Sequence, residues 1–169
     1  MPIQRLNHAV LYVRDAAASA DFYSAALGFT VRHEMPGAVF LGAPGSVNDH
    51  DLGLFSIGPG AGASGAGRST VGLYHLAWEV ERLGDLVEIM KSLEEHHALV
   101  GASDHGTSKS LYARDADGIE FEVHWNVPPE LMTESDRSIR TEPLDVDATL
   151  SRFGADAPSH STTLRAPQH

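Results

Sequence analysis

The sequence predicts an α+β fold in which two βαβββ modules form a curved mixed sheet. Three observations lead to this prediction. A short motif occurs twice along the chain, helical periodicity follows each copy, and three strand-like segments follow each helix. The length agrees, because 169 residues are enough for one domain with a core and too few for two ordinary domains.

The repeated motif marks the first strand of each module. LNHAVLYV (residues 6–13) and LYHLAWEV (residues 73–80) share Leu, His and Val at matching places. Both segments alternate in the manner of a half-buried strand. His8 and His75 occupy the same place in the repeat, at an offset of 67 residues (75 − 8). We therefore expect both histidines on the leading strands, facing each other if a pseudo-twofold axis relates the modules.

Helical patterns follow both strands. Asp15 is placed to cap AAASADFYSAAL, and Gly28 is a natural residue to end that helix. Its expected inward residues are Phe22, Ala26 and Tyr23. In the second module, RLGDLVEIMKSLEEH carries apolar residues at helical spacing, namely Leu83, Leu86, Val87, Met90 and Leu93.

Each helix gives way to three short strand-like segments. They are FTVRHEM, AVFLG and DLGLFSI in the first module, and ALVGASDHG, KSLYARD and IEFEVHW in the second. The last strand follows an Asp117-Gly118 turn. One face of it carries Ile119, Phe121, Val123 and Trp125, and the other carries Glu120, Glu122 and His124. The apolar face is expected to pack on the helices, which leaves three polar side chains in the concavity of the sheet.

The domain organisation follows from these elements. Residues 1–128 are predicted to form a single domain, with modules at about 3–57 and 71–127. The Gly-rich segment 58–69 is a flexible connector rather than a phosphate loop, because it lacks the Gly-Lys-Ser/Thr ending. Residues 129–169 form an extension that is partly disordered, with a short helix around 145–153 and a disordered tail from 155 onward.

Composition excludes several functions. The chain has no cysteine, which removes disulfides, thiolate zinc sites and a cysteine nucleophile. The net charge is −11 and no basic stripe occurs, so nucleic-acid binding is not expected. The first residues show no signal pattern, and no apolar run approaches membrane length. A cytoplasmic protein without a membrane role is therefore expected.

The chemistry that we expect comes from two imidazoles and one carboxylate. His8, His75 and a carboxylate from the last strand, which carries Glu120 and Glu122, would form the facial triad that suits non-haem Fe(II) and leaves coordination positions open for catalysis. A single strand histidine is more often structural, and alternating charge is usually a solvated face. The recurrence of histidine at the same place in both modules, together with a carboxylate on the inward face of the last strand, favours a metal site. Because the repeat offset sets Phe55 against Glu122, one site is expected and not two.

These features resemble the vicinal oxygen chelate superfamily, and within it the type I extradiol ring-cleaving dioxygenases. The resemblance covers roughly residues 3–127. Its most specific part is DHGTSKSLYARDADGIEFE, whose order of residues is similar to the extradiol signature. That signature implies active-site roles for His105 and Tyr112 and a metal-binding role for Glu122. The segment NDHDLGLF is similar to the one that carries a further active-site histidine, here His50. Ala116 replaces the usual proline, and Asp117-Gly118 can still turn the chain.

The resemblance implies a catechol 2,3-dioxygenase-like reaction. The cofactor would be Fe(II), with Mn(II) or another divalent metal as the alternative. The partners would be a small aromatic diol and O₂, and the chain would work as a homodimer or a higher homo-oligomer. His50 would act as general acid or base, and His105 and Tyr112 would donate hydrogen bonds to the substrate. Glu120 is expected to be solvated at the rim, and His124 to be a polar strand residue.

Two other functions share the fold and remain open. A glyoxalase-like metal-dependent isomerase or lyase would need a fourth protein ligand, and Phe55 stands at the matching place. A binding protein of the bleomycin-resistance type would need no metal, and the two repeated histidines count against it.

Overall fold

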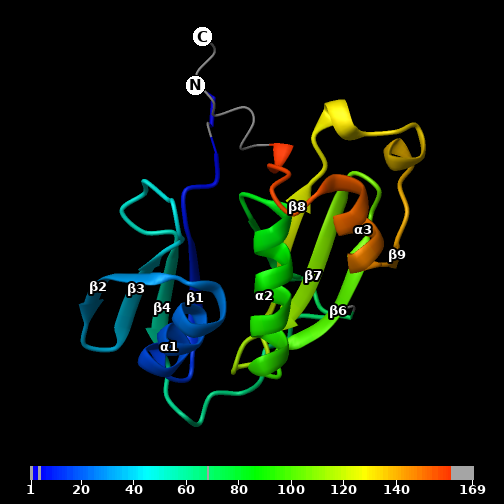
Figure 1. Cartoon of the computed structure of the whole chain (residues 1–169). Coiled ribbons are helices and arrows are strands. Elements are labelled where there is room, and N and C mark those ends of the chain that lie inside the picture. Colours follow the sequence, from blue (N-terminus) through cyan, green and yellow to red (C-terminus); the bar gives the residue numbers. More distant parts are fainter. Residues whose placement is uncertain (1, 4, 68, 161–169) are drawn as a thin grey trace. The chain divides into compact units, whose positions relative to one another are not determined.

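The structure is a computed structural model, which describes residues 2–3, 5–67 and 69–160. The chain divides into two compact units (Figure 1). The first contains residues 1–65 and the turn Asp115–Ile119, and the second contains residues 66–114 and 120–169. Helices in the described part of the chain are all too short or too polar to cross a membrane.

The first unit holds one βαβββ module. Its elements are β1 (Ala9–Val13), α1 (Ala16–Leu27), β2 (Thr30–Met35), β3 (Ala38–Gly42) and β4 (Leu52–Ser56). The sheet order is β1-β4-β3-β2, in which β1 and β4 run parallel and the other neighbours antiparallel. This arrangement confirms the predicted order of elements.

Helix α1 begins and ends where the sequence predicts. The Asp15 carboxylate accepts hydrogen bonds from the backbone N–H groups of Ala17 and Ala18, at 2.9 and 3.2 Å. Gly28 ends the helix at a φ of 73°, in the left-handed region that favours glycine. The ring of Tyr23 is buried, whereas Phe22, which we expected to face inward, is only partly covered.

The second unit repeats the order and adds to it. Its elements are β5 (Leu76–Glu79), α2 (Leu83–Glu95), β6 (Leu99–Asp104), β7 (Ser108–Arg114), β8 (Glu120–Asn126), the short 3₁₀ turns Pro129–Leu131 and Ser135–Arg137, β9 (Glu142–Pro143) and α3 (Val146–Phe153). The sheet order is β5-β8-β7-β6-β9. Both modules therefore have the predicted α+β organisation, as two mixed sheets.

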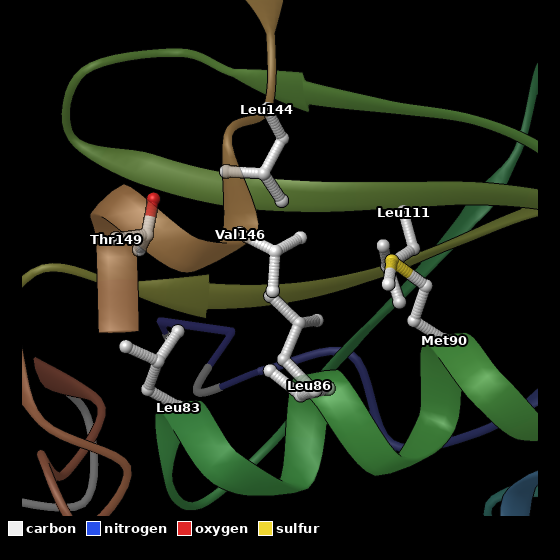
Figure 2. Close-up of a pocket in the computed structure, with 8 residues that line it drawn as sticks. Leu83, Leu86, Met90, Leu111, Leu144, Val146 and Thr149 are labelled. Carbon is white, nitrogen blue, oxygen red and sulfur yellow. The ribbon is translucent and has the colours of Figure 1, made fainter. Parts of the chain in front are cut away.

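The core of the second unit lies between its sheet and α2. Phe121, Val123 and Trp125 of β8 are buried, as their alternation predicts. Residues of α2, β7, α3 and the segment that leads into α3 line a small apolar pocket (Figure 2). Its lining residues are Leu83, Leu86, Val87, Met90, Leu111, Leu144, Val146 and Thr149. The extension thus contributes side chains to this core.

The start of the predicted tail is ordered. The backbone N–H groups of Leu83 and Gly84 donate to the carbonyls of Ala157 and Ala155. The indole N–H of Trp125 also donates to Ala157, at 3.1 Å. The predicted disorder from residue 155 onward is therefore wrong for residues 155–160. The carbonyls of Ala155 and Ala157 satisfy donors at the start of α2, and the polar composition of this segment does not reveal these bonds. Residues 161–169 lie outside the described part.

The two leading strands begin later than predicted. Strand β1 begins at Ala9, whose N–H donates to the carbonyl of Asp51, and β5 begins at Leu76, opposite Phe121. His8 and His75 are therefore not on the strands, and each lies one residue before its strand. The partner strands set these starting points, and alternation in the sequence continues past them. That the two leading strands lie side by side stays a prediction.

Candidate active site

Glu122 is a buried carboxylate on the last strand of its module. It lies on β8 between Phe121 and Val123, whose side chains take the opposite face and anchor the strand in the core. The residue is 8% exposed. A buried carboxylate needs a partner, and the Nε2 atom of His75 lies 3.0 Å from its Oε2 atom. The structure therefore brings together two of the three residues that the sequence nominates as metal ligands.

The donors of this pair suit a divalent metal. An imidazole nitrogen and a carboxylate oxygen are both ligand types that first-row divalent metals take. The ring of His75 is flanked by those of Tyr74 and Tyr112, at centroid distances of 4.5 and 5.8 Å. Its Nδ1 atom is buried and has no hydrogen-bond partner among the described residues. Within that same part of the chain, no group of three or more His, Cys, Asp or Glu side chains is spaced to hold a metal ion.

Tyr112 and His105 lie next to this pair. Tyr112 is directly opposite Glu122 in the β7–β8 ladder. Burial, followed by the charge of Glu122, raises the pKa of the Tyr112 phenol, so the hydroxyl stays protonated. Its oxygen lies 2.9 Å from Nε2 of His105. The signature residues His105 and Tyr112 are thus hydrogen-bonded to each other.

Arg140 also belongs to this neighbourhood, and sequence reasoning missed it. Its carbonyl oxygen lies 3.0 Å from Nδ1 of His105. Residues 105 and 140 are far apart in the sequence, and the segment around Arg140 shows neither periodicity nor a motif. No signal in the sequence connects the two.

A second histidine cluster lies in the first unit. The rings of His8 and His50 have centroids 4.6 Å apart. Nδ1 of His8 lies 2.8 Å from the side-chain oxygen of Asn7, and Nδ1 of His50 lies 2.9 Å from a carboxylate oxygen of Asp49. Hydrogen bonds from His50 and from His33 lower the pKa of the Asp49 carboxyl. The structure therefore places the predicted acid/base histidine beside the predicted ligand of the same unit.

Glu120 and His124 lie on β8, on either side of Glu122. Glu120 is not simply solvated, because the guanidinium of Arg114 lies 3.4 Å from its carboxylate and the side chain is only 18% exposed. The pairing follows from the β7–β8 ladder, in which Arg114 and Glu120 are direct partners. His124, which is also on β8, lies opposite Ser110 of β7.

The ladders correct the residue that matches Glu122 in the first module. Val10 and Ala77 are equivalent in the repeat. Val10 pairs with Gly53, and Ala77 pairs with Glu122. The counterpart of Glu122 is therefore Gly53 and not Phe55. The constant offset was wrong because the segment between the first and last strands is two residues longer in the second module.

Comparison with known proteins gives the family. The model of the Glyoxalase/Bleomycin resistance protein/Dioxygenase superfamily matches residues 5–123. The chain belongs to this superfamily. The range that the model covers contains His8, His50, His75, His105, Tyr112 and Glu122.

Two curated members of the superfamily are similar in sequence. A biphenyl-2,3-diol 1,2-dioxygenase 3 from Rhodococcus globerulus is 33% identical over 133 residues, which cover 77% of this chain and 68% of that protein. A catechol-2,3-dioxygenase from Bacillus subtilis is 28% identical over 152 residues, which cover 88% of this chain. The match spans only 52% of that second relative.

Solved structures from the superfamily share the fold. A glyoxylase/bleomycin resistance protein/dioxygenase domain from Frankia has a TM-score of 0.60 at 23% identity, covering 74% of this chain and 93% of that one. A lactoylglutathione lyase from Agrobacterium tumefaciens has a TM-score of 0.54 at 22% identity, with 73% and 95% covered. A mutant of the fosfomycin resistance protein FosX from Listeria monocytogenes, solved with Mn(II), has a TM-score of 0.56 at 18% identity, with 80% and 96% covered. At these identities the likeness concerns the fold alone.

Proposed function

We propose that this protein is a metal-dependent extradiol dioxygenase, which opens the ring of a catechol-type diol beside its hydroxyls with O₂. The observation that carries the proposal is the buried His75–Glu122 pair, with the hydroxyl of Tyr112 held beside it by His105. The sequence similarity to two diol dioxygenases supports the same reaction class.

His75, Glu122 and His8 are the proposed ligands of one Fe(II) ion. His8 suits this role because its Nδ1 atom faces the side-chain oxygen of Asn7, which can only accept a hydrogen bond. The ring hydrogen then lies on Nδ1, and Nε2 keeps the lone pair that a metal ligand needs. Bound Fe(II) supplies open coordination positions and mediates electron transfer between a diol and O₂.

Three further residues are proposed to transfer protons or to bind the diol. His50 is the acid/base group: the Asp49 carboxylate accepts from its Nδ1–H, which leaves Nε2 to take up or return a proton. Tyr112 accepts a hydrogen bond from a diol hydroxyl at its phenolic oxygen, because its own hydrogen, which the raised pKa retains, is directed to His105. His105 contacts the same hydroxyl and sets its direction.

The alternative of a glyoxalase-like isomerase or lyase is less well supported. Such a site needs a fourth protein ligand at the place that matches Glu122 in the first module. Gly53 stands there and has no side chain. A methyl group at Gly53 would meet Val10 at 3.4 Å and Phe40 at 3.5 Å, which is ordinary van der Waals contact, so the missing side chain and not a lack of space removes a ligand there.

Anaerobic loading with Fe(II), followed by exposure to catechols and O₂, tests the proposal. We expect about one Fe per chain, O₂ consumption at an electrode, and a yellow ring-opened product followed by absorbance. His75→Ala should lose the metal and the activity. His96→Ala is the matched control, because His96 is exposed at the end of α2 and contacts the carbonyl of Ser92.

The outcomes separate the functions. A loaded protein that neither consumes O₂ nor forms the product with simple, alkyl and aryl catechols is not a dioxygenase of this kind. Retention of one metal per chain by His75→Ala would remove that residue from the ligand set. If the protein is active with Mn(II) and inactive with Fe(II), manganese takes the place of iron in the proposal. Iron, a dimeric or larger assembly and a cytoplasmic location stay predictions.

A further inference from the structure

Both ring nitrogens of His105 have partners, and these partners settle which nitrogen carries the hydrogen. Nδ1 lies 3.0 Å from the carbonyl oxygen of Arg140. A carbonyl oxygen only accepts, so Nδ1 must donate. The hydroxyl of Thr141, 3.3 Å from Nδ1, can share that hydrogen. In the neutral ring Nε2 is then an acceptor, and the hydroxyl of Tyr112, at 2.9 Å, donates to it.

The carbonyl of Arg140 is held in place by its own side chain. The guanidinium donates to a carboxylate oxygen of Asp104 at 2.9 Å and to the carbonyl of Ser135 at 2.8 Å. It also lies 3.7 Å from the carboxylate of Asp136. Asp104 directly precedes His105 in the chain. The same residue thus binds the side chain of the residue before His105 and the imidazole itself.

The anchors of Arg140 are themselves fixed. Asp136 is fully buried and accepts from the N–H and hydroxyl of Thr133, at 2.8 and 2.7 Å, and from Arg152 of α3. Asp104 also pairs with the ammonium of Lys109, a residue that is 2% exposed. Buried charges of this kind keep one arrangement, because each would be left unpaired if it moved.

We propose that Arg140 is a positioning residue, which fixes the tautomer of His105 and thereby the direction of the Tyr112 hydroxyl. The extension after residue 128 thus has a role in the site, which it performs through one backbone carbonyl. The role in turnover rests on the proposed function, whereas the tautomer does not. With hydrogen on Nε2 instead, the ring would donate to Tyr112 and turn its O–H bond elsewhere.

The tautomer can be measured directly on the full chain. ¹⁵N spectra of the ring nitrogens distinguish Nδ1–H from Nε2–H at a pH where the imidazoles are neutral. The chain has 10 histidines, and the signals of His105 are those missing from His105→Gln. We expect His105 to be almost entirely Nδ1–H in the wild type and a mixture of both tautomers in Arg140→Ala.

Kinetics of the Fe(II)-loaded protein with a catechol give the second readout. Arg140→Ala should lower kcat about tenfold and change KM less than twofold, because the metal ligands are untouched and the hydroxyl is misdirected. Arg137→Ala is the matched control, since Arg137 lies in the same segment and is exposed. It should leave the His105 tautomer, kcat and KM as they are.

Several results would overturn the inference. A wild-type His105 in the Nε2–H form would do so even if Arg140→Ala failed to fold. An unchanged tautomer in a folded Arg140→Ala would also do so. If catechols are not turned over but the tautomer depends on Arg140, the proposed function fails and the positioning of His105 by the extension stands.

Discussion

The hydroxyl of Tyr112 is the single group on which the proposed reaction depends most after the metal ligands. It bonds to His105 at 2.9 Å, and the ring lies 5.8 Å from that of His75. We predict that Tyr112→Phe lowers kcat/KM about tenfold or more, because one hydrogen bond to a reacting oxygen contributes roughly 1–3 kcal/mol. Steady-state O₂ consumption measures this effect, and metal analysis should show an unchanged Fe content. An unchanged kcat/KM would mean that Tyr112 only packs against the strand.

His50 offers a second test at the same scale. Its ring lies beside that of His8, but it is assigned to proton transfer and not to the metal. His50→Gln should reduce turnover while the protein keeps its metal, because glutamine preserves a polar side chain and cannot act as an acid or base near neutral pH. Metal analysis and initial rates on one sample separate the two effects. Loss of the metal would make His50 a ligand.

Tyr23 tests how a buried carboxylate is stabilised in the first unit. Its hydroxyl donates to Asp115 at 3.1 Å, and burial raises the pKa of Asp115. A buried carboxyl with a raised pKa makes the folded protein more stable as the pH falls, because burial disfavours the charged form of the group. Tyr23→Phe should lower the free energy of unfolding by about 1–3 kcal/mol at pH 7. The difference from the wild type should narrow at a lower pH, where Asp115 takes up a proton.

Urea unfolding at the two pH values measures this change. The Tyr23→Phe penalty would be independent of pH if the lost packing of the hydroxyl, rather than the charge of Asp115, were its cause. A larger penalty at the lower pH would mean that the Tyr23 hydroxyl favours the protonated form of Asp115 and not its charged form.

At the scale of elements, sequence patterns correctly predicted the helix ends and strand faces that depend on residues close together in the chain. Asp15 and Gly28 delimit α1, and the alternation of β8 separates Phe121 from Glu122. Patterns failed where a partner elsewhere in the chain decides. The ladders set the start of β1 and the match of Gly53 with Glu122. The carbonyl groups of Ala155 and Ala157 accept from donors at the start of α2.

The same division holds for the candidate site. The repeat and the signature pointed to four residues of the second unit. The structure shows them as two contacting pairs, His75 with Glu122 and His105 with Tyr112. The sequence could not point to Arg140, because the contact is made by its backbone carbonyl and every residue has such a group. The placement of His8 and His50 beside each other is likewise visible only in the folded unit.

Gly106 shows how closely the extension approaches the β6–β7 turn. Its φ is +79°, and an added Cβ would lie 2.5 Å from the carbonyl oxygen of Asp136 and 2.9 Å from that of Ser138. Gly106→Ala should therefore lower the free energy of unfolding by about 3 kcal/mol or more, because backbone strain and a clash with backbone add up. Urea unfolding measures the loss.

Gly118 is the control for this substitution. Its φ is +80°, and an added Cβ would meet nothing within 4 Å. Gly118→Ala should cost only the conformational part, about 1–2 kcal/mol. Equal losses for the two variants would mean that the extension yields to the new methyl group, and that its backbone is not held as firmly as the Asp136 contacts indicate.

At the scale of the whole molecule, we predict a homo-oligomer, most simply a dimer. Symmetric twofold dimers are the commonest assembly of soluble chains, and β2 is exposed along its whole length at the edge of its sheet. Light scattering at working concentration should give twice the chain mass of 18.1 kDa or a larger multiple. A mass of one chain would reject the prediction.

Strand β9 has a consequence for how copies of the chain avoid one another. It pairs with β6 through Ser103–Pro143 and Asp104–Glu142, and so forms one border of the five-stranded sheet. Pro143 has no N–H group, and Glu142 is exposed and charged. A strand from another molecule would find few donors there and a repelling carboxylate. This border thus resists the growth of intermolecular sheets, so the extension also protects the protein from aggregation.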